Sequence, residues 1–354
     1  MEAVNWGLAE KVAVRVAGTE PLAHSYHYAS LAPDFAELTA QAEELIFDEI
    51  GMRSLRGPAR AQVVDRGDWV RANIGSMRRL LQPLTKRLTT MRGPSIIPAQ
   101  MLSAVEVGAM LGWMSQRVLG QYDALMFDDD ASAGDVVYYV GPNVLALEKR
   151  FGFPPREFRL WLALHEVTHR VQFTGVPWMQ DYFRSLIDAT LSAADIDAKR
   201  FLDALARAVE AVRAGRNPLD DGGLVALLAG PEQRETLFKT QGLMSLLEGH
   251  GDVTMDRAGR EFVPSAKRFS DTLHARRNQK QPPVARFVQQ ITGLESKLKQ
   301  YEAGERFIEA VEAAGGPPLL ARAWERPENL PTLAEIRDPS SWVARITAEL
   351  AATP

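Results

Sequence analysis

Apolar residues in the first third of the chain recur every three or four positions, which is the spacing of amphipathic α-helices. The pattern predicts helices at residues 3–17, 34–52, 68–88 and 99–119, with loops at 24–28 and 53–61. In the first helix, the inward stripe is expected to be Val4, Leu8, Val12 and Val16. In the fourth, Gly108 and Gly112 lie about one turn apart and indicate close packing against another helix.

One stretch departs from the helical pattern. Residues 135–140, DVVYYV, are rich in β-branched and aromatic side chains and precede Gly-Pro, which predicts a strand. Its edge could pair with an extended substrate, or the strand could be one element of a small sheet. Helices are expected again at 143–151, 156–173, 179–191, 194–214, 224–228, 232–256, 284–314, 318–324 and 340–351. The fold class expected is mainly α, a helical bundle-like protein with a small β element beside the helix at 156–173.

Composition narrows the classes of partner. A formal net charge of −4 provides no overall attraction to nucleic acid or to an anionic membrane. No apolar run approaches the roughly 20 residues that span a bilayer, and the N-terminal stretch lacks the pattern of a signal peptide. We therefore expect a soluble, cytoplasmic protein without nucleic-acid or membrane partners. Its oligomeric state is left open.

The candidate chemistry lies in the helix at 156–173, which contains His165-Glu166-Val167-Thr168-His169. Residues four apart share one face of a helix, so both imidazoles can bind a single metal ion. Glu166 lies about 100° around the helix, where it can take a proton from water instead of binding the metal. Imidazole suits zinc, and a chain without cysteine leaves histidine and carboxylate as ligands. The alternative is two structural histidines satisfied by neighbouring groups.

A catalytic zinc site requires a third protein ligand. Glu248 and Asp252 are four residues apart on one face of a predicted helix, so we expect Glu248 to bind zinc and Asp252 to accept a hydrogen bond from a ligating imidazole. His250 points roughly 200° away from Glu248. The alternative is that His250 binds zinc and Glu248 supports it. Gly249 and Gly251, each costly in a helix by about 1 kcal/mol, are expected to allow close approach to the His165–His169 helix.

These residues predict hydrolysis of an amide bond, with water activated by Glu166 beside zinc. The tetrahedral oxyanion of such a reaction needs a further donor. The candidates by chemistry alone are His250, His274, Arg276 and Tyr301. We expect residues 1–130 to form an N-terminal helical part and residues 131–354 the metal-site catalytic part, which together make one compact unit sharing a cleft.

The substrate class is open at this point. A peptide is expected if the strand edge at Val136–Val140 is exposed along a groove, and a small amide metabolite if the pocket is closed. A third possibility is a non-catalytic helical interaction protein that holds a structural metal. The intact Glu166 disfavours that possibility, because metal binding alone does not require it.

The motif His165-Glu166-Val167-Thr168-His169, followed downstream by Glu248-Gly249-His250-Gly251-Asp252, resembles the pattern of gluzincin metallopeptidases such as thermolysin. The resemblance implies His165, His169 and Glu248 as zinc ligands, Glu166 as general base, and Asp252 as the residue that orients a ligating histidine. The interval from His169 to Glu248 is longer than in thermolysin-like enzymes.

A resemblance over nearly the whole chain is to a bacterial family of zinc-dependent hydrolases, some of them labelled as associated with deazaflavin coenzyme biosynthesis. It is carried by the stretches NWGLAEKVA, MLGWMSQRVLGQYD, FRLWLALHEVTHRVQFTGVPWM, LMSLLEGHGDVTMD, LKQYEAGERFIEAV and PENLPTLAEI. This resemblance implies a zinc hydrolase and names no substrate.

Overall fold

The computed structural model describes residues 4–20, 22, 25–80, 96–122, 135–192, 231–277 and 296–352. Contacts divide the chain into two compact units, the first made of Met1–Pro177 and Thr254–Asn278 and the second of Trp178–Val253 and Gln279–Pro354. The elements are helices apart from one three-stranded sheet, which confirms the expected mainly α fold with a small β element. The division at residues 130 and 131 stays a prediction.

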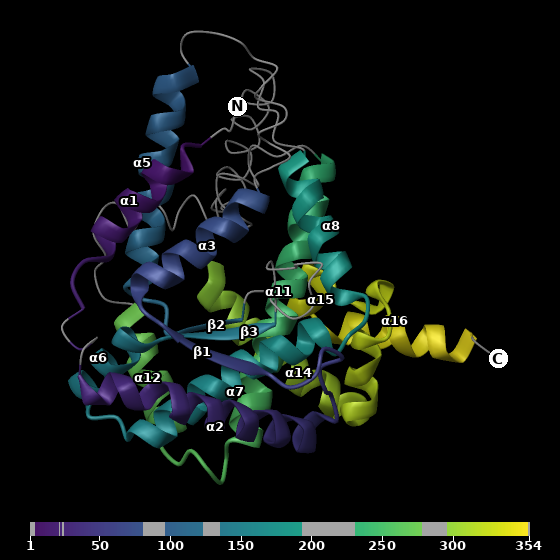
Figure 1. Ribbon diagram of the computed structural model, residues 1–354. Helices are drawn as coiled ribbons and strands as arrows, with labels where there is room; N and C mark the ends of the chain where they lie inside the picture. Colours follow the sequence, from purple (N-terminus) through teal and green to yellow (C-terminus); the bar gives the residue numbers. More distant parts are fainter. Residues whose placement is uncertain are drawn as a thin grey trace. The chain divides into compact units, whose positions relative to one another are not determined.

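The first unit contains the sheet and the helices around it (Figure 1). Its elements are α1 (Trp6–Ala17), α2 (Tyr26–Ile50), β1 (Arg60–Val64), α3 (Arg66–Leu80), α5 (Ile96–Ser115), β2 (Gly120–Tyr122), β3 (Val136–Val140), α6 (Gly141–Phe151), α7 (Pro155–Thr174) and α12 (Ala266–Arg277). The strand order is β1-β3-β2, with β1 parallel and β2 antiparallel to β3.

Strand alternation directs the two faces of β3 to different helices. Tyr139 stacks on Phe35 of α2 at 3.9 Å between ring centroids, and its hydroxyl lies 2.8 Å from that of Thr39. On the opposite face, Tyr138 packs into a core that includes Trp69 of α3. The sheet is therefore covered on both faces, by α2 and α7 on one side and by α3 on the other (Figure 1).

The strand predicted at 135–140 is confirmed, and it is the central strand. Because β1 and β2 occupy both of its edges, an extended substrate cannot pair along Val136–Val140. The alternative, an element of a small sheet, is the correct one. The loop predicted at 53–61 is wrong at its end, where β1 begins at Arg60.

Helices α1 and α5 pack through small residues. A Cβ on Gly108 would lie 2.4 Å from the Ala9 carbonyl oxygen, and one on Gly112 equally close to that of Ala13, which confirms close packing at these glycines. The expected apolar stripe on α1 is wrong at Val16, which is 37% exposed, whereas Val4 is buried as expected. The buried positions within the helix are Ala9, Ala13 and Ala17. Val12 and Val16 border the same contact, since their Cβ atoms would lie 2.9 Å and 2.6 Å from a Cβ on Gly108 and on Gly112.

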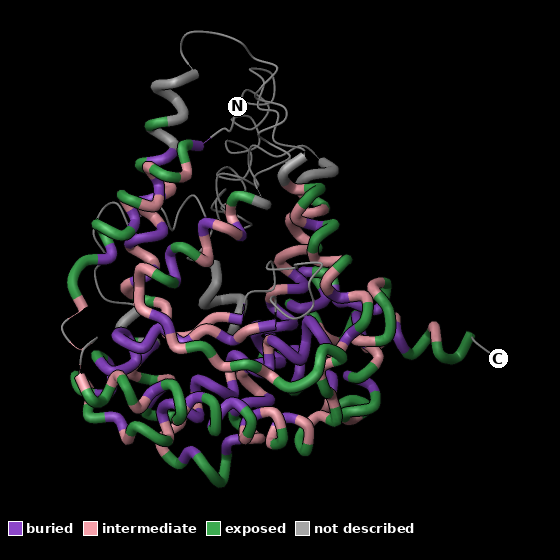
Figure 2. Tube along the Cα trace, viewed as in Figure 1, coloured by how far each residue is buried: buried purple, intermediate pink, exposed green. Residues whose placement is uncertain are grey.

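Helix α2 begins earlier than expected. Ser25 caps it by accepting a hydrogen bond from the Tyr28 N–H at 3.3 Å, so the loop predicted at 24–28 is wrong from Tyr26 onward. Its buried face includes Phe35, Leu38, Ala42 and Ile46. Buried and exposed positions alternate along this helix in Figure 2.

The second unit is helical in its described part. It contains α8 (Met179–Ser192), most of α11 (Pro231–Ala258), α14 (Ser296–Ala321), η1 (Arg322–Trp324), η2 (Pro327–Asn329), α15 (Leu333–Arg337) and α16 (Pro339–Ala352). The helix α14 kinks at Gly316, whose φ is 70°, directly before two prolines. The break that we predicted between the helices at 284–314 and 318–324 is thus present as a kink. The helices predicted at 194–214 and 224–228 lie outside the described residues.

The second unit also contains a close helix contact through glycine. A Cβ on Gly249 of α11 would lie 2.2 Å from the carbonyl carbon of Gly304 in α14. The expectation that Gly249 allows approach to the His165–His169 helix is therefore wrong, since the close neighbour is α14. None of the described helices in either unit combines the length and apolar character that a bilayer crossing requires.

Candidate metal centre

The helix α7 carries the central motif, and local sequence explains its limits. Pro155 stands at its first position, where a missing N–H costs nothing, and Glu157 lies in the first turn. It ends at Thr174, where a Cβ on Gly175 would lie 2.7 Å from the Arg53 carbonyl oxygen. The helix predicted at 156–173 is confirmed within two residues at each end.

His165 and His169 lie on one side of α7, both half-buried. Their ring centroids are 4.6 Å apart with an interplanar angle of 87°. Trp161, one turn before His165, lies nearly parallel to it at 6.5 Å. Spacing of four residues on a regular helix therefore brings both imidazoles to one place.

His169 has a partner that sequence analysis missed. Its Nδ1 lies 2.9 Å from Oε1 of Gln172, which is fully buried on the same helix. An acceptor at this position favours a proton on Nδ1 and leaves Nε2 as the metal-binding atom. The available signal was the spacing of three residues between His169 and Gln172.

One ligand atom from each of His165, His169 and Glu248 lies within 4.8 Å of the others. Two imidazoles and one carboxylate, with a coordination position left open, form the donor set of a catalytic zinc ion, so these residues fit that metal. Glu248 lies in α11 and is 8% exposed.

His250 and Asp252, which flank Glu248 in the sequence, differ in burial. His250 is buried in the second unit, with its ring 4.9 Å from that of Trp324. Asp252 is half-buried in α11. The role of Asp252 as an acceptor for a ligating histidine stays a prediction.

Glu166 is 7% exposed and is held by β2. The Tyr122 N–H donates a hydrogen bond to its Oε2 at 3.0 Å. A Cβ on Gly120 would lie 2.7 Å from the Glu166 Cγ, so a larger residue here would require the Glu166 side chain to move. Sequence analysis missed both groups. No strand was predicted at residues 120–122, so the sequence carried no local signal for this contact.

Tyr139 is fully buried, and Glu166 is among the charged groups that act on its hydroxyl. Burial raises the pKa of its hydroxyl, and the negative charge of Glu166 raises that pKa further, against the lowering effect of the hydrogen bond with Thr39. The hydroxyl therefore stays protonated.

The remaining sequence candidates cannot be placed at the site. His274 and Arg276 lie in α12 and Tyr301 in α14, but their side chains are outside the described residues. Their proposed role as oxyanion donors stays a prediction.

Comparison with known proteins supports the same chemistry. The sequence model of zincin-like metallopeptidases matches residues 4–343. The chain belongs to this family. A solved structure from Chloroflexus aurantiacus, described as a candidate hydrolase with a novel fold, is 33% identical with a TM-score of 0.72, covering 97% of this chain and 99% of that one. No curated protein sequence matches.

Membership of the zincin-like family supports a zinc-dependent hydrolase. The His-His-Glu group on α7 and α11 provides ligands of the corresponding type. The expected association with deazaflavin coenzyme biosynthesis and the cytoplasmic location stay predictions.

Proposed function

We propose that this zincin-like protein is a zinc-dependent metallopeptidase that cleaves an amide bond. Its ligands would be His165, His169 and Glu248, and its general base Glu166. The observation that carries the proposal is the convergence of two imidazoles and one carboxylate around a helix that also bears Glu166. Family membership supports it, since zincin-like metallopeptidases share this chemistry.

Different residues of the chain bind the metal, transfer the proton and orient the general base. Zinc, when bound, lowers the pKa of water towards about 7 and polarises the substrate carbonyl. His165, His169 and Glu248 hold the metal and leave one position open. Glu166 accepts the proton of the attacking water on a carboxylate oxygen and delivers it to the leaving amine. The hydrogen bond from the Tyr122 N–H orients that carboxylate during both transfers.

A second candidate substrate class is a small amide metabolite. Both edges of β3 are occupied, and the Tyr122 N–H of the edge strand β2 is bonded to Glu166. Fewer backbone groups are then offered to an extended peptide than a strand edge normally provides. A small amide needs no such pairing.

Metal analysis and one substitution test the proposal. We expect purified protein to contain about one zinc per chain by inductively coupled plasma mass spectrometry. Glu166→Gln should keep the zinc and lose cleavage of a quenched fluorescent peptide library by about 10²–10⁴-fold. Absence of zinc after reconstitution, or undiminished cleavage by Glu166→Gln, would contradict the mechanism. Zinc binding without cleavage of any peptide, together with turnover of small N-acyl amides, would favour the second substrate class.

A further inference from the structure

The strand β2 has one side paired with β3 and the other directed away from it. The Val140 N–H donates to the Leu119 carbonyl at 2.8 Å, so Leu119 and Gln121 direct their backbone polar groups towards β3. Alternation along an antiparallel strand then directs the backbone groups of Gly120 and Tyr122 the other way. Helix α7 packs against β2 within the same unit (Figure 1).

Glu166 reaches this outer side of β2 from α7. Its Oε2 accepts the Tyr122 N–H at 3.0 Å, and the residue is only 7% exposed. A hydrogen bond to a carboxylate is stronger than one between neutral groups, and burial strengthens it further. The contact therefore fixes the orientation of the carboxylate.

The small size of Gly120, and not its backbone conformation, explains why glycine stands beside Glu166. Its φ is not among the positive values that favour glycine in the described residues. A Cβ there would lie 2.7 Å from Cγ, 2.7 Å from Oε1 and 2.9 Å from Cδ of Glu166. These three nearest atoms all belong to one side chain. A methyl group at residue 120 would displace the carboxylate from its position beside Tyr122.

We propose that Gly120 and the backbone N–H of Tyr122 are the positioning groups for the general base. The N–H fixes Oε2 of Glu166 and with it the orientation of the carboxylate. Gly120 provides the space in which the side chain lies in this orientation. This inference rests on the proposed function, because it gives the two groups a role only through Glu166.

A double-mutant cycle in stability tests the contact without needing a substrate. We expect Gly120→Ala to lower the thermal unfolding midpoint by several degrees, because the methyl group overlaps Glu166. In a Glu166→Ala background the three overlapping atoms are gone, so the same substitution should leave the midpoint nearly unchanged. Gly75→Ala, where a Cβ meets nothing within 4 Å, is the matched control and should not lower it.

Catalysis distinguishes positioning from a purely structural role. On the best-cleaved peptide of the fluorescent library, Gly120→Ala should retain zinc and KM while kcat falls about 100-fold, the scale of a displacement near 1 Å. Glu166→Asp removes one methylene and makes room, so adding Gly120→Ala to that variant should cost less than about tenfold.

The outcomes separate this inference from the proposed function. Equal midpoint losses in both Glu166 backgrounds, or a rise in KM with kcat unchanged, would overturn the role of Gly120 while zinc binding and cleavage by the wild type stand. A wild-type protein that binds no zinc would overturn the catalytic role itself, whatever coupling the stability cycle shows.

Discussion

The helix α7 carries two groups of polar side chains with opposite surroundings. On one side, Arg170 is fully buried and donates to Asp135, to Glu43 and to the Gly57 carbonyl, all on neighbouring segments. On the other side, His165 and His169 approach each other. A buried guanidinium and its carboxylates depend on each other, because removal of one partner leaves a buried charge without compensation. Imidazoles gathered with a carboxylate serve a metal ion. The partner that each group meets, and not burial or polarity, tells a structural residue from a functional one.

The largest effect is expected on the histidine side. His165→Ala or His169→Ala removes one of three ligands, so zinc should be lost and hydrolysis should become unmeasurable. Metal content and peptide cleavage measure the two effects. The unfolding midpoint should also fall, because zinc no longer stabilises the folded state. Retention of one zinc per chain in either variant would remove that histidine from the ligand set.

Substitution of Arg170 should lower the stability of the protein and leave its zinc binding intact. Arg170→Ala leaves the buried Asp135 carboxylate without its cation and should destabilise the protein by about 3–5 kcal/mol, measured by chemical denaturation. Zinc should still bind at temperatures where the variant is folded. Arg170→Leu combined with Asp135→Leu should restore part of the stability, because it removes a buried charge together with its partner. Loss of zinc without loss of stability would place Arg170 on the functional side of the comparison.

Features that depend on spacing within one helix could be predicted from the sequence, and contacts between distant segments could not. The pair His165 and His169 needs only the periodicity of one helix, so local spacing predicts it. The same holds for Gly108 and Gly112, whose small size indicates a close helix even though the pattern did not identify α1. Gly316 and its prolines likewise marked a break that the structure contains.

Contacts between distant segments were out of reach. Strand β2 has three residues and no apolar alternation, so nothing local predicts that Gly120 meets Glu166, 46 residues away. The same limit misassigned Gly249, because helix spacing shows that a partner must come close and not which helix it is. On α1, the burial of Ala9 and Ala13 follows from the close approach of Gly108 and Gly112 on α5. The periodicity of the sequence predicts which face of a helix is buried, and only the tertiary structure shows which element that face contacts.

A smaller effect is expected at Gln172, which would act on the metal only through His169. Gln172→Leu keeps the volume but removes the acceptor for His169 Nδ1, so zinc affinity should weaken by about 10–100-fold in a chelator competition. Gln172→Glu retains an acceptor and should restore most of the affinity. Equal affinity in Gln172→Leu and wild type would mean that Gln172, like Arg170, supports the fold alone.

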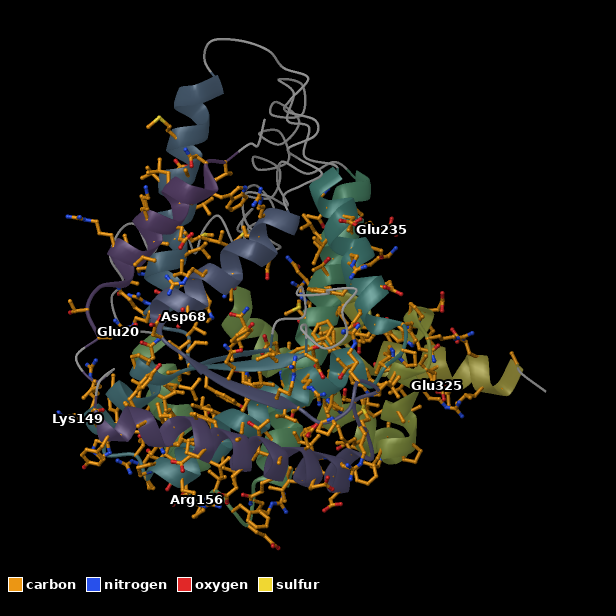
Figure 3. All side chains as sticks on the ribbon, viewed as in Figure 1. Glu20, Asp68, Lys149, Arg156, Glu235 and Glu325 are labelled. Atoms are coloured by element: carbon orange, nitrogen blue, oxygen red, sulfur yellow. The ribbon has the colours of Figure 1, made fainter. Side chains whose placement is uncertain are left out.

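The smallest effect is expected from an ion pair at the exposed beginning of α7. Arg156, labelled in Figure 3, donates to Glu37 of α2 at 2.5 Å, with the two side chains 64% and 63% exposed. The hydrogen bond to Arg156 lowers the pKa of Glu37. Any stability from this pair is therefore present above the unfolded pKa of the carboxyl and is lost as the pH falls through its lower folded value. Solvent screens an exposed pair, so Glu37→Gln should leave the unfolding midpoint and the zinc content unchanged at pH 7, and wild type and variant should also converge in acid. A clear fall of the midpoint at pH 7 would show that this exposed pair stabilises the fold, as the buried Arg170 does.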